Sequence, residues 1–167
     1  LTFLMILKLK SIKKTKIFYL VVLIFFLEFG LYWQKYLKYN HDYSQNWQYG
    51  YQQMTEIVKE NYSKYRQIYI TKKYGEAHEF ILFYWPWDPA SFQNDPQKKW
   101  DFHADWYWVN SFDKFTFIND WEIKNLSIPK NTLLVTSPQN YPQNNAKLVN
   151  KLNFLNGQEA FDFVSYD

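Results

Sequence analysis

Two carboxylates and a histidine alternate within the segment WDFHADW, residues 100–106. If this segment is a β-strand, Asp101, His103 and Asp105 share one face, because successive side chains point to opposite faces of a strand. Aspartate oxygens and a histidine nitrogen could then hold a divalent metal ion. A solvated loop or strand edge explains the same residues, and the sequence places no further ligand beside them. We therefore expect no metal site and no other cofactor.

A histidine and a carboxylate also lie close together in KKYGEAHEF, where Glu76 and His78 follow Tyr74. A histidine–carboxylate pair can transfer protons in acid–base catalysis. Polar residues on an exposed helix surface explain this segment equally well. The sequence contains no GxSxG, P-loop, GxGxxG or HExxH motif and only four glycines. It therefore predicts no catalytic residue and no glycine-rich phosphate loop.

The most unusual stretch is FYWPWDP, residues 83–89. Exposed Trp and Tyr rings can stack on sugar rings or lie at a lipid interface, and the same rings can also cap a hydrophobic core. Three adjacent rings flanked by prolines cannot all point inward, so we expect Trp85 or Trp87 to be substantially exposed. The residues that we expect to bind a substrate are Tyr74, His78, Trp85, Trp87 and Asp88.

Helices and strands must position these side chains. Apolar residues recur at helical spacing over residues 45–62 and predict an amphipathic helix that Ser44 could cap. The residues of this stripe are Trp47, Tyr51, Met54, Val58 and Tyr62. A second helix is predicted over residues 76–85, and the prolines that follow it predict a loop.

Runs of β-branched, apolar and aromatic residues predict strands at residues 66–71, 112–118 and 132–136. Residues 148–155 and 160–164 flank Asn156-Gly157, which is the strongest signal for a two-residue β-hairpin. Helices come first and the hairpin last. The expected fold class is therefore α/β, with an N-terminal transmembrane helix followed by a small mixed-sheet domain with packed helices and a C-terminal β-hairpin.

A membrane span is predicted at residues 17–33. Residues 17–27 are unbroken apolar sequence, and the apolar character resumes after Glu28. Seventeen residues lie at the short end of what crosses a hydrocarbon core of about 30 Å. No small-residue cleavage site follows, which favours a retained span over a signal peptide. Glu28 lies near the outer interface or contacts neighbouring spans, and both explanations remain open.

The charge distribution orients this span. Of the 19 Lys and Arg residues, five lie within residues 1–16, which contain no acid, so the rest of the chain holds 14 basic against 16 acidic side chains. The positive-inside rule places residues 8–16 in the cytoplasm and the residues after 33 outside. A folded part without a basic surplus argues against nucleic-acid binding. The absence of cysteine excludes disulfides and thiolate metal sites.

Five segments resemble, in order and spacing, the C-terminal extracytoplasmic region of bacterial GT-C type membrane glycosyltransferases, which are related to the dolichyl-phosphate-mannose–protein mannosyltransferases. After the span they are YSQNWQYGYQQ, QIYITKKYGEAHEFILFYWPWDPASFQ, VNSFDKFTF, NTLLVTSPQNYP and KLNFLNGQEAFDFV. The resemblance covers most of residues 17–167. It implies a polyprenyl-phosphate-linked sugar as donor, a glycan, lipid or protein as acceptor, and a catalytic aspartate in an outer loop upstream of this sequence.

The expected organisation follows. Residues 1–16 are the end of a preceding span and a cytoplasmic basic loop, residues 17–33 the transmembrane helix, residues 34–44 a linker, and residues 45–167 an extracytoplasmic α/β domain at the cell membrane. The chain is then the C-terminal part of a glycosyltransferase, not catalytic on its own, that binds or supports substrate beside upstream spans of the same protein. The alternative is a non-enzymatic, membrane-anchored module that binds a glycan or a protein.

Overall fold

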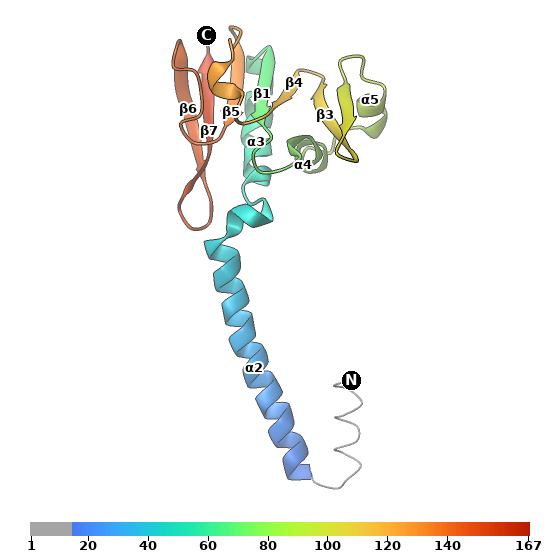
Figure 1. Cartoon of the computed structure of the whole chain (residues 1–167), viewed down its shortest axis with the longest axis vertical. Coiled ribbons are helices and arrows are strands. Elements are labelled where there is room, and N and C mark those ends of the chain that lie inside the picture. Colours follow the sequence, from blue (N-terminus) through green and yellow to red (C-terminus); the bar gives the residue numbers. More distant parts are fainter. Residues whose placement is uncertain (1–14) are drawn as a thin grey trace. The chain divides into compact units, whose positions relative to one another are not determined.

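The computed structural model describes residues 15–167 (Figure 1). The chain divides into two compact units, which meet between Asp42 and Tyr43. The expected preceding span and most of the basic loop fall within residues 1–14 and lie outside the described residues.

The first unit is the helix α2 (Thr15–Asp42), which has 28 residues. At 1.5 Å per residue it is about 42 Å long, enough to cross a hydrocarbon core of about 30 Å. By length and composition it could span a membrane, and the apolar window within it has no buried residue. The helix contains the predicted span at residues 17–33 and continues to Asp42, so most of the expected linker is helical.

The second unit contains a seven-stranded mixed sheet in the order β2-β3-β4-β1-β5-β7-β6 (Figure 1). Its strands are β1 (Gln67–Thr71), β2 (Lys99–His103), β3 (Trp106–Phe112), β4 (Phe115–Ile118), β5 (Thr132–Thr136), β6 (Ala146–Asn153) and β7 (Glu159–Tyr166). Strand β1 pairs in parallel with β4 and β5, and every other pairing is antiparallel. The expected fold class, a mixed α/β domain with packed helices and a C-terminal hairpin, is confirmed.

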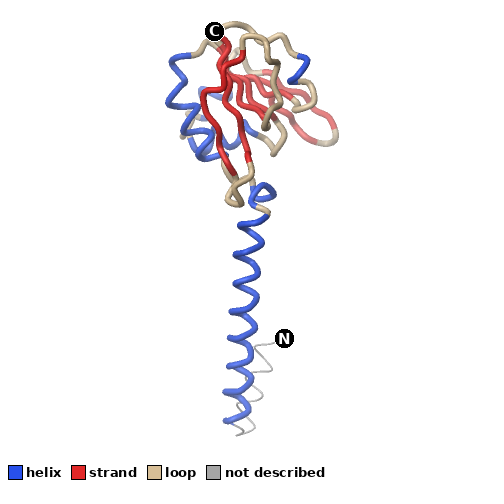
Figure 2. Tube along the Cα trace, turned by 90° about the vertical axis from the view of Figure 1, so that its left-hand side faces the viewer, coloured by secondary structure: helices blue, strands red, loops and turns tan. Residues whose placement is uncertain are grey.

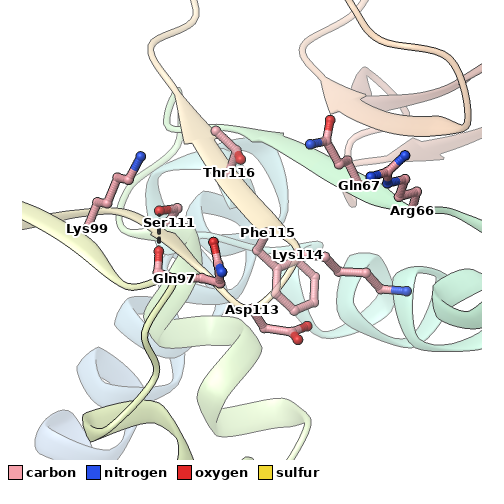
Figure 3. A pocket seen from close by; sticks show the side chains of 9 residues that line it. All are labelled: Arg66, Gln67, Gln97, Lys99, Ser111, Asp113, Lys114, Phe115 and Thr116. Atoms are coloured by element: carbon pink, nitrogen blue, oxygen red, sulfur yellow. Dashed lines mark hydrogen bonds between the residues drawn. The ribbon is translucent and has the colours of Figure 1, made fainter.

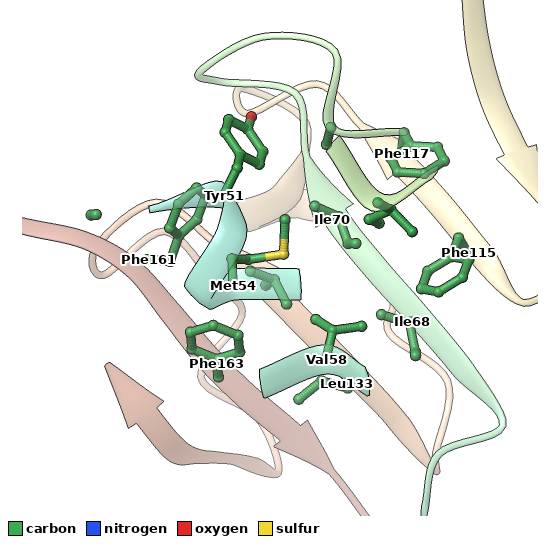
Figure 4. Packing of buried hydrophobic residues seen from close by; sticks show 14 of the residues in the cluster. Tyr51, Met54, Val58, Ile68, Ile70, Phe115, Phe117, Leu133, Phe161 and Phe163 are labelled. Carbon is green, nitrogen blue, oxygen red and sulfur yellow. The ribbon is translucent and has the colours of Figure 1, made fainter. Parts of the chain in front are cut away.

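Helices cover one face of this sheet (Figure 2). They are α3 (Tyr51–Asn61), α4 (Ala77–Tyr84) and α5 (Pro89–Gln93). The chain also forms three short 3₁₀ turns, η1 (Ser44–Trp47), η2 (Tyr62–Lys64) and η3 (Ile123–Asn125). Figure 4 shows Met54 and Val58 of α3 lying over Ile68 and Ile70 of β1. Alternate residues of the strands face these helices because side chains of a strand alternate in direction.

The other face is covered only in part. A second cluster joins Leu134 of β5 and Val164 of β7 to Ile123 of η3. Leu126 and Ile128 pack against the same cluster from the segment that connects β4 to β5. This segment therefore crosses the sheet on the face opposite α3 and α4.

The helix predicted over residues 45–62 is wrong in its first part. The chain forms η1, Gln48 then takes a positive φ of 56°, and α3 begins only after Gly50, whose φ is 102°. The break takes Trp47 out of the apolar stripe, and its side chain is 54% exposed. Ser44 does not cap a helix through its side chain; its Oγ accepts a hydrogen bond from the Leu155 N–H at 3.1 Å.

The strand predicted at residues 112–118 is also wrong, because it is two strands. Asp113 has a φ of 47° and turns the chain, so that Phe112 of β3 pairs with Phe115 of β4. The segment predicted as a loop after the second helix contains α5 and the β2–β3 hairpin. That hairpin turns at Ala104 and Asp105, both with positive φ, and this pair carries no glycine or asparagine to mark it.

The other predicted elements are confirmed. Strand β5 has the predicted bounds, and α4 lies within the predicted 76–85. The C-terminal hairpin forms, but its strands end at Asn153 and begin again at Glu159, so the connection is longer than two residues. Within it, the N–H of Gly157, which has a φ of 83°, donates to the Phe154 carbonyl at 3.0 Å.

Candidate functional site

The parallel strands create a switch point in the topology. After β1 the chain passes to α4, whose Ile81 packs on one face of the sheet, and reaches β4 by way of α5 and the β2–β3 hairpin. After β4 it passes through η3, whose Ile123 packs on the opposite face, and returns as β5. Crossovers that leave neighbouring strands on opposite faces open a crevice at the carboxyl ends of those strands, and ligands of open α/β sheets bind there. A ligand site is therefore expected at the carboxyl ends of β1 and β4.

A pocket of about 440 Å³ lies at this position. It draws its lining from the ends of β1 and β4 and from the β2–β3 hairpin. The lining residues are Lys72, Lys73, Asp101, Trp108, Asn110, Asn119, Asp120 and Trp121. Ligand pockets typically have volumes of about 300–1,000 Å³, so this pocket is large enough for a small ligand.

Asp120, one of the lining residues, is held in place by several hydrogen bonds. Its Oδ1 accepts hydrogen bonds from the hydroxyls of Thr71 and Ser137, each at 2.8 Å. Its carbonyl accepts from the Asn140 amide at 2.7 Å. The second oxygen, Oδ2, lies 3.6 Å from the Nζ of Lys73. Asp120 thus ties together the ends of three strands and is held in one orientation, which pre-organises the site.

A second set of hydrogen bonds lines the side of the pocket. The Nζ of Lys72 donates to Asn110 Oδ1 at 2.7 Å, and the Asn110 amide donates to Asp101 Oδ1 at 3.1 Å. The pairing of β2 with β3 shifts register beside Asn110, since Trp100 pairs with Val109 and the next pair includes Ser111. A bulge of this kind changes the direction of a side chain. Here the side chain of Asn110, at the bulge, contacts Lys72 at the end of β1.

Two tryptophans add aromatic surface to these polar groups. Trp108 is half-buried, and the Nζ of Lys72 lies 5.9 Å from its ring centroid. Trp121 is 76% exposed. The pocket therefore offers ring faces together with ammonium, amide and carboxylate groups. Rings bind the apolar face of a ligand, while the charged groups form strong hydrogen bonds with its hydroxyls.

His78 and Tyr74, both predicted to bind substrate, lie beside this pocket but do not line it. His78 is only 7% exposed, and its Nδ1 lies 3.2 Å from Glu76 Oε2. Burial, with a smaller contribution from Lys72, lowers the pKa of His78 to about 4, so the ring is neutral at pH 7. Burial also raises the pKa of Glu76.

The ring of Tyr74 packs edge-on against Phe154 and Phe161. Burial, and next the nearby carboxylates of Asp120 and Asp162, raise its pKa to about 12. The phenol is therefore neutral at physiological pH. Tyr74 contributes mainly to the core beneath the helices.

The other predicted binding residues lie around α5. Trp85 and Trp87 are half-buried, with ring centroids 5.3 Å apart, and both pack against Tyr62. Trp87 also lines an apolar hollow of about 380 Å³. Asp88 caps α5 by accepting hydrogen bonds from the hydroxyl and N–H of Ser91, and these bonds lower its pKa. Neither tryptophan reaches the pocket at the ends of β1 and β4.

The three residues considered as metal ligands do not share one strand face. Strand β2 contains Asp101 and ends at His103, and Asp105 lies in the turn with a φ of 59°. Among the side chains that the structure describes, which do not include His103, no group of three or more His, Cys, Asp or Glu residues is arranged to hold a metal ion. Asp101 belongs instead to the hydrogen-bonded side of the pocket.

Of the residues that line this pocket, the sequence pattern marks only Asp101 as a candidate. One signal was available, since Lys72 and Lys73 directly follow a predicted strand, and Asp120 and Trp121 follow the end of another. Polar residues directly after parallel strands are where ligand sites form. That β1 and β4 are parallel neighbours, however, has no local signal in the sequence.

Comparisons with known proteins identify no relatives. No protein-family model matches the sequence. No curated protein and no solved structure shows significant similarity to the chain.

Proposed function

We propose that this chain is a membrane-anchored, saccharide-binding domain whose ligand occupies the pocket at the carboxyl ends of β1 and β4. One observation carries the proposal. Trp108 and Trp121 line the same pocket as the hydrogen-bonded groups of Lys72, Asn110 and Asp120. A sugar has an apolar face of C–H groups and a rim of hydroxyls, and this combination of rings and polar groups complements both.

The charges of the pocket favour a polyhydroxylated ligand over a nucleotide. Lys72 and Lys73 are balanced by Asp101 and Asp120 among the lining residues. A di- or triphosphate requires a surplus of positive charge or a cradle of backbone N–H groups. Carboxylates, by contrast, are strong acceptors for sugar hydroxyls.

Membrane anchorage is the second part of the proposal. The helix α2 is long and apolar enough to cross a bilayer, and the five lysines before residue 17 orient it with the domain outside. The resemblance to the outer region of GT-C type glycosyltransferases supplies a context. We propose that the domain binds a saccharide substrate for such an enzyme, whose catalytic carboxylate lies in upstream spans.

Binding measurements on the full chain in detergent micelles test the pocket. We expect oligosaccharides from a panel of neutral and acidic glycans to bind, and Trp108→Ala and Trp121→Ala each to weaken binding about tenfold, or ~1.4 kcal/mol. Trp47→Ala is the matched control, because this exposed tryptophan lies on η1 outside the pocket. The proposal is wrong if no glycan binds, or if the control weakens binding as much as the pocket variants do.

A non-enzymatic glycan-binding module uses the same pocket, so binding alone does not separate it from the transferase context. The reading frame upstream of residue 1 does. Several further hydrophobic spans with an outer-loop Asp or Glu support the transferase. A start codon at Met5 supports the free-standing module.

A further inference from the structure

A second pocket, of about 470 Å³, lies on the partly uncovered face of the same sheet. Lys99 of β2 pairs with Ser111 of β3, and Ser111 pairs with Thr116 of β4, so these three form one row across the strands. Phe115 and Phe117 belong to the cluster under the helices, which places Thr116 between them on the opposite face. Figure 3 shows Lys99 and Arg66 toward opposite ends of this groove.

Three side chains in this groove offer hydrogen-bond donors that are not engaged within the protein. Arg66 and Lys99 have no ion-pair or side-chain hydrogen-bond partner within residues 15–167. Gln67 Oε1 accepts from the Tyr69 hydroxyl at 3.4 Å, which leaves the amide N–H groups of Gln67 to donate. A groove whose available groups are a guanidinium, an ammonium and an amide binds an anion.

The acidic side chain in this groove is already engaged. Asp113 accepts a hydrogen bond from the Tyr62 hydroxyl at 2.5 Å. Lys114 is engaged as well, since its Nζ donates to the carbonyls of Tyr62 and Tyr65, the latter at 2.9 Å. That hydrogen bond leaves the charge of Asp113 in place, but neither Arg66 nor Lys99 forms an ion pair with it within residues 15–167. The lining holds three cations, Arg66, Lys99 and Lys114, against this one carboxylate, so positive charge is in excess.

The groove continues toward the saccharide pocket. Lys99 lines the groove and Asp101 lines the saccharide pocket. They lie two residues apart on β2 and on the same face, which corresponds to about 7 Å along the strand. One or two sugar units bridge that separation, so a ligand of several units can occupy both pockets.

We propose that the ligand is an anionic saccharide, whose carboxylate or phosphate group binds in the groove lined by Arg66 and Lys99 while a neighbouring sugar unit occupies the pocket at Trp108 and Trp121. This inference rests on the proposed function and adds the charge class of the ligand. The attraction of Arg66 and Lys99 for the anion also makes binding dependent on salt, because exposed charges are screened at high ionic strength.

Three probes of equal length test the inference on the full chain in detergent: galactotetraose, tetragalacturonate, and galactotetraose with a terminal phosphate. At low salt we expect one of the acidic probes to bind at least tenfold more tightly than the neutral one. The acidic probe that binds more tightly identifies carboxylate or phosphate as the recognised group. The double variant Arg66→Gln/Lys99→Gln removes this preference.

The control is Lys124→Gln/Lys147→Gln, which removes two exposed charges outside both pockets and keeps the preference. Equal affinities for the three probes overturn this inference and leave the proposed function standing, and so does a preference that survives in Arg66→Gln/Lys99→Gln. Absence of binding by all three probes and by the wider glycan panel overturns the proposed function, and this inference with it.

Discussion

At the residue scale, the candidate site depends on a few side chains that serve structure and binding together. Asp120 accepts hydrogen bonds from two hydroxyls that are almost fully buried, those of Thr71 and Ser137. Its other oxygen lies toward Lys73 at the pocket. A carboxylate held in this way needs no reorganisation when a ligand arrives, so its orientation does not cost affinity.

This arrangement predicts how substitutions of Asp120 affect stability. Asp120→Ala leaves two buried hydroxyls without their acceptor and should lower the free energy of unfolding by about 2–4 kcal/mol. Asp120→Asn keeps one acceptor oxygen and should cost about 1 kcal/mol. Denaturant unfolding of the full chain in detergent measures both. Equal losses for the two variants would show that the hydroxyl contacts contribute little.

Residues of this kind are hard to find from sequence. Thr71 and Asp120 are 49 residues apart, and Lys72 and Asn110 are 38 apart. They meet only through the parallel pairing of β1 with β4 and the bulge in β3. Asp101 was noticed because it alternates with His103 within one short segment. The strand ends before Asp105, so the alternation expected over Asp101, His103 and Asp105 does not extend to the third residue.

At the element scale, the local pattern of apolar residues predicts which segments are helices and which are strands. It does not predict where a helix or strand is interrupted, because the interruptions depend on backbone dihedral angles. The apolar stripe correctly predicts that Tyr51, Met54 and Val58 are buried on one helix. The same stripe predicts a helix that begins too early, because the spacing of apolar residues carries no information on the positive φ of Gln48 and Gly50. The turn at Asp113 was missed for the same reason, since residues of ordinary strand composition surround it.

Gly50 is the position where such geometry has a measurable cost. Its φ of 102° is unfavourable for residues with a side chain, and an added Cβ would lie 3.3 Å from Leu152 and 3.5 Å from Phe161. Gly50→Ala should therefore lower the free energy of unfolding by about 2 kcal/mol, which combines backbone strain with crowding.

Gly157→Ala is the matched comparison. Gly157 also has a positive φ, of 83°, but an added Cβ there meets open space. Only strain remains, and we expect a loss of about 1 kcal/mol. Thermal or denaturant unfolding of the two variants separates these contributions. A larger loss for Gly157→Ala than for Gly50→Ala would contradict this account.

At the scale of the whole molecule, the part of the chain that the structure describes contains one apolar helix followed by one α/β domain. The lysine distribution predicts that residues 8–16 are cytoplasmic and that the domain lies outside. Alkaline phosphatase fused after Asp167 should be active, because this reporter functions only outside the cytoplasm. A reporter of cytoplasmic location, such as β-galactosidase, should be inactive at the same position. The reverse pattern would refute the orientation.

The central position of β1 has a consequence for synthesis on the ribosome. Ile68 of β1 pairs with Phe115 of β4 and with Leu133 of β5, both made much later. The other partner of β5 is β7, which spans Glu159–Tyr166 and is made later still. Chains grow at about 5–20 residues per second, so the apolar side chains of β1 wait several seconds for their neighbours. Folding of the domain is thus completed only after α2 has left the ribosome, which favours help from a chaperone during that interval.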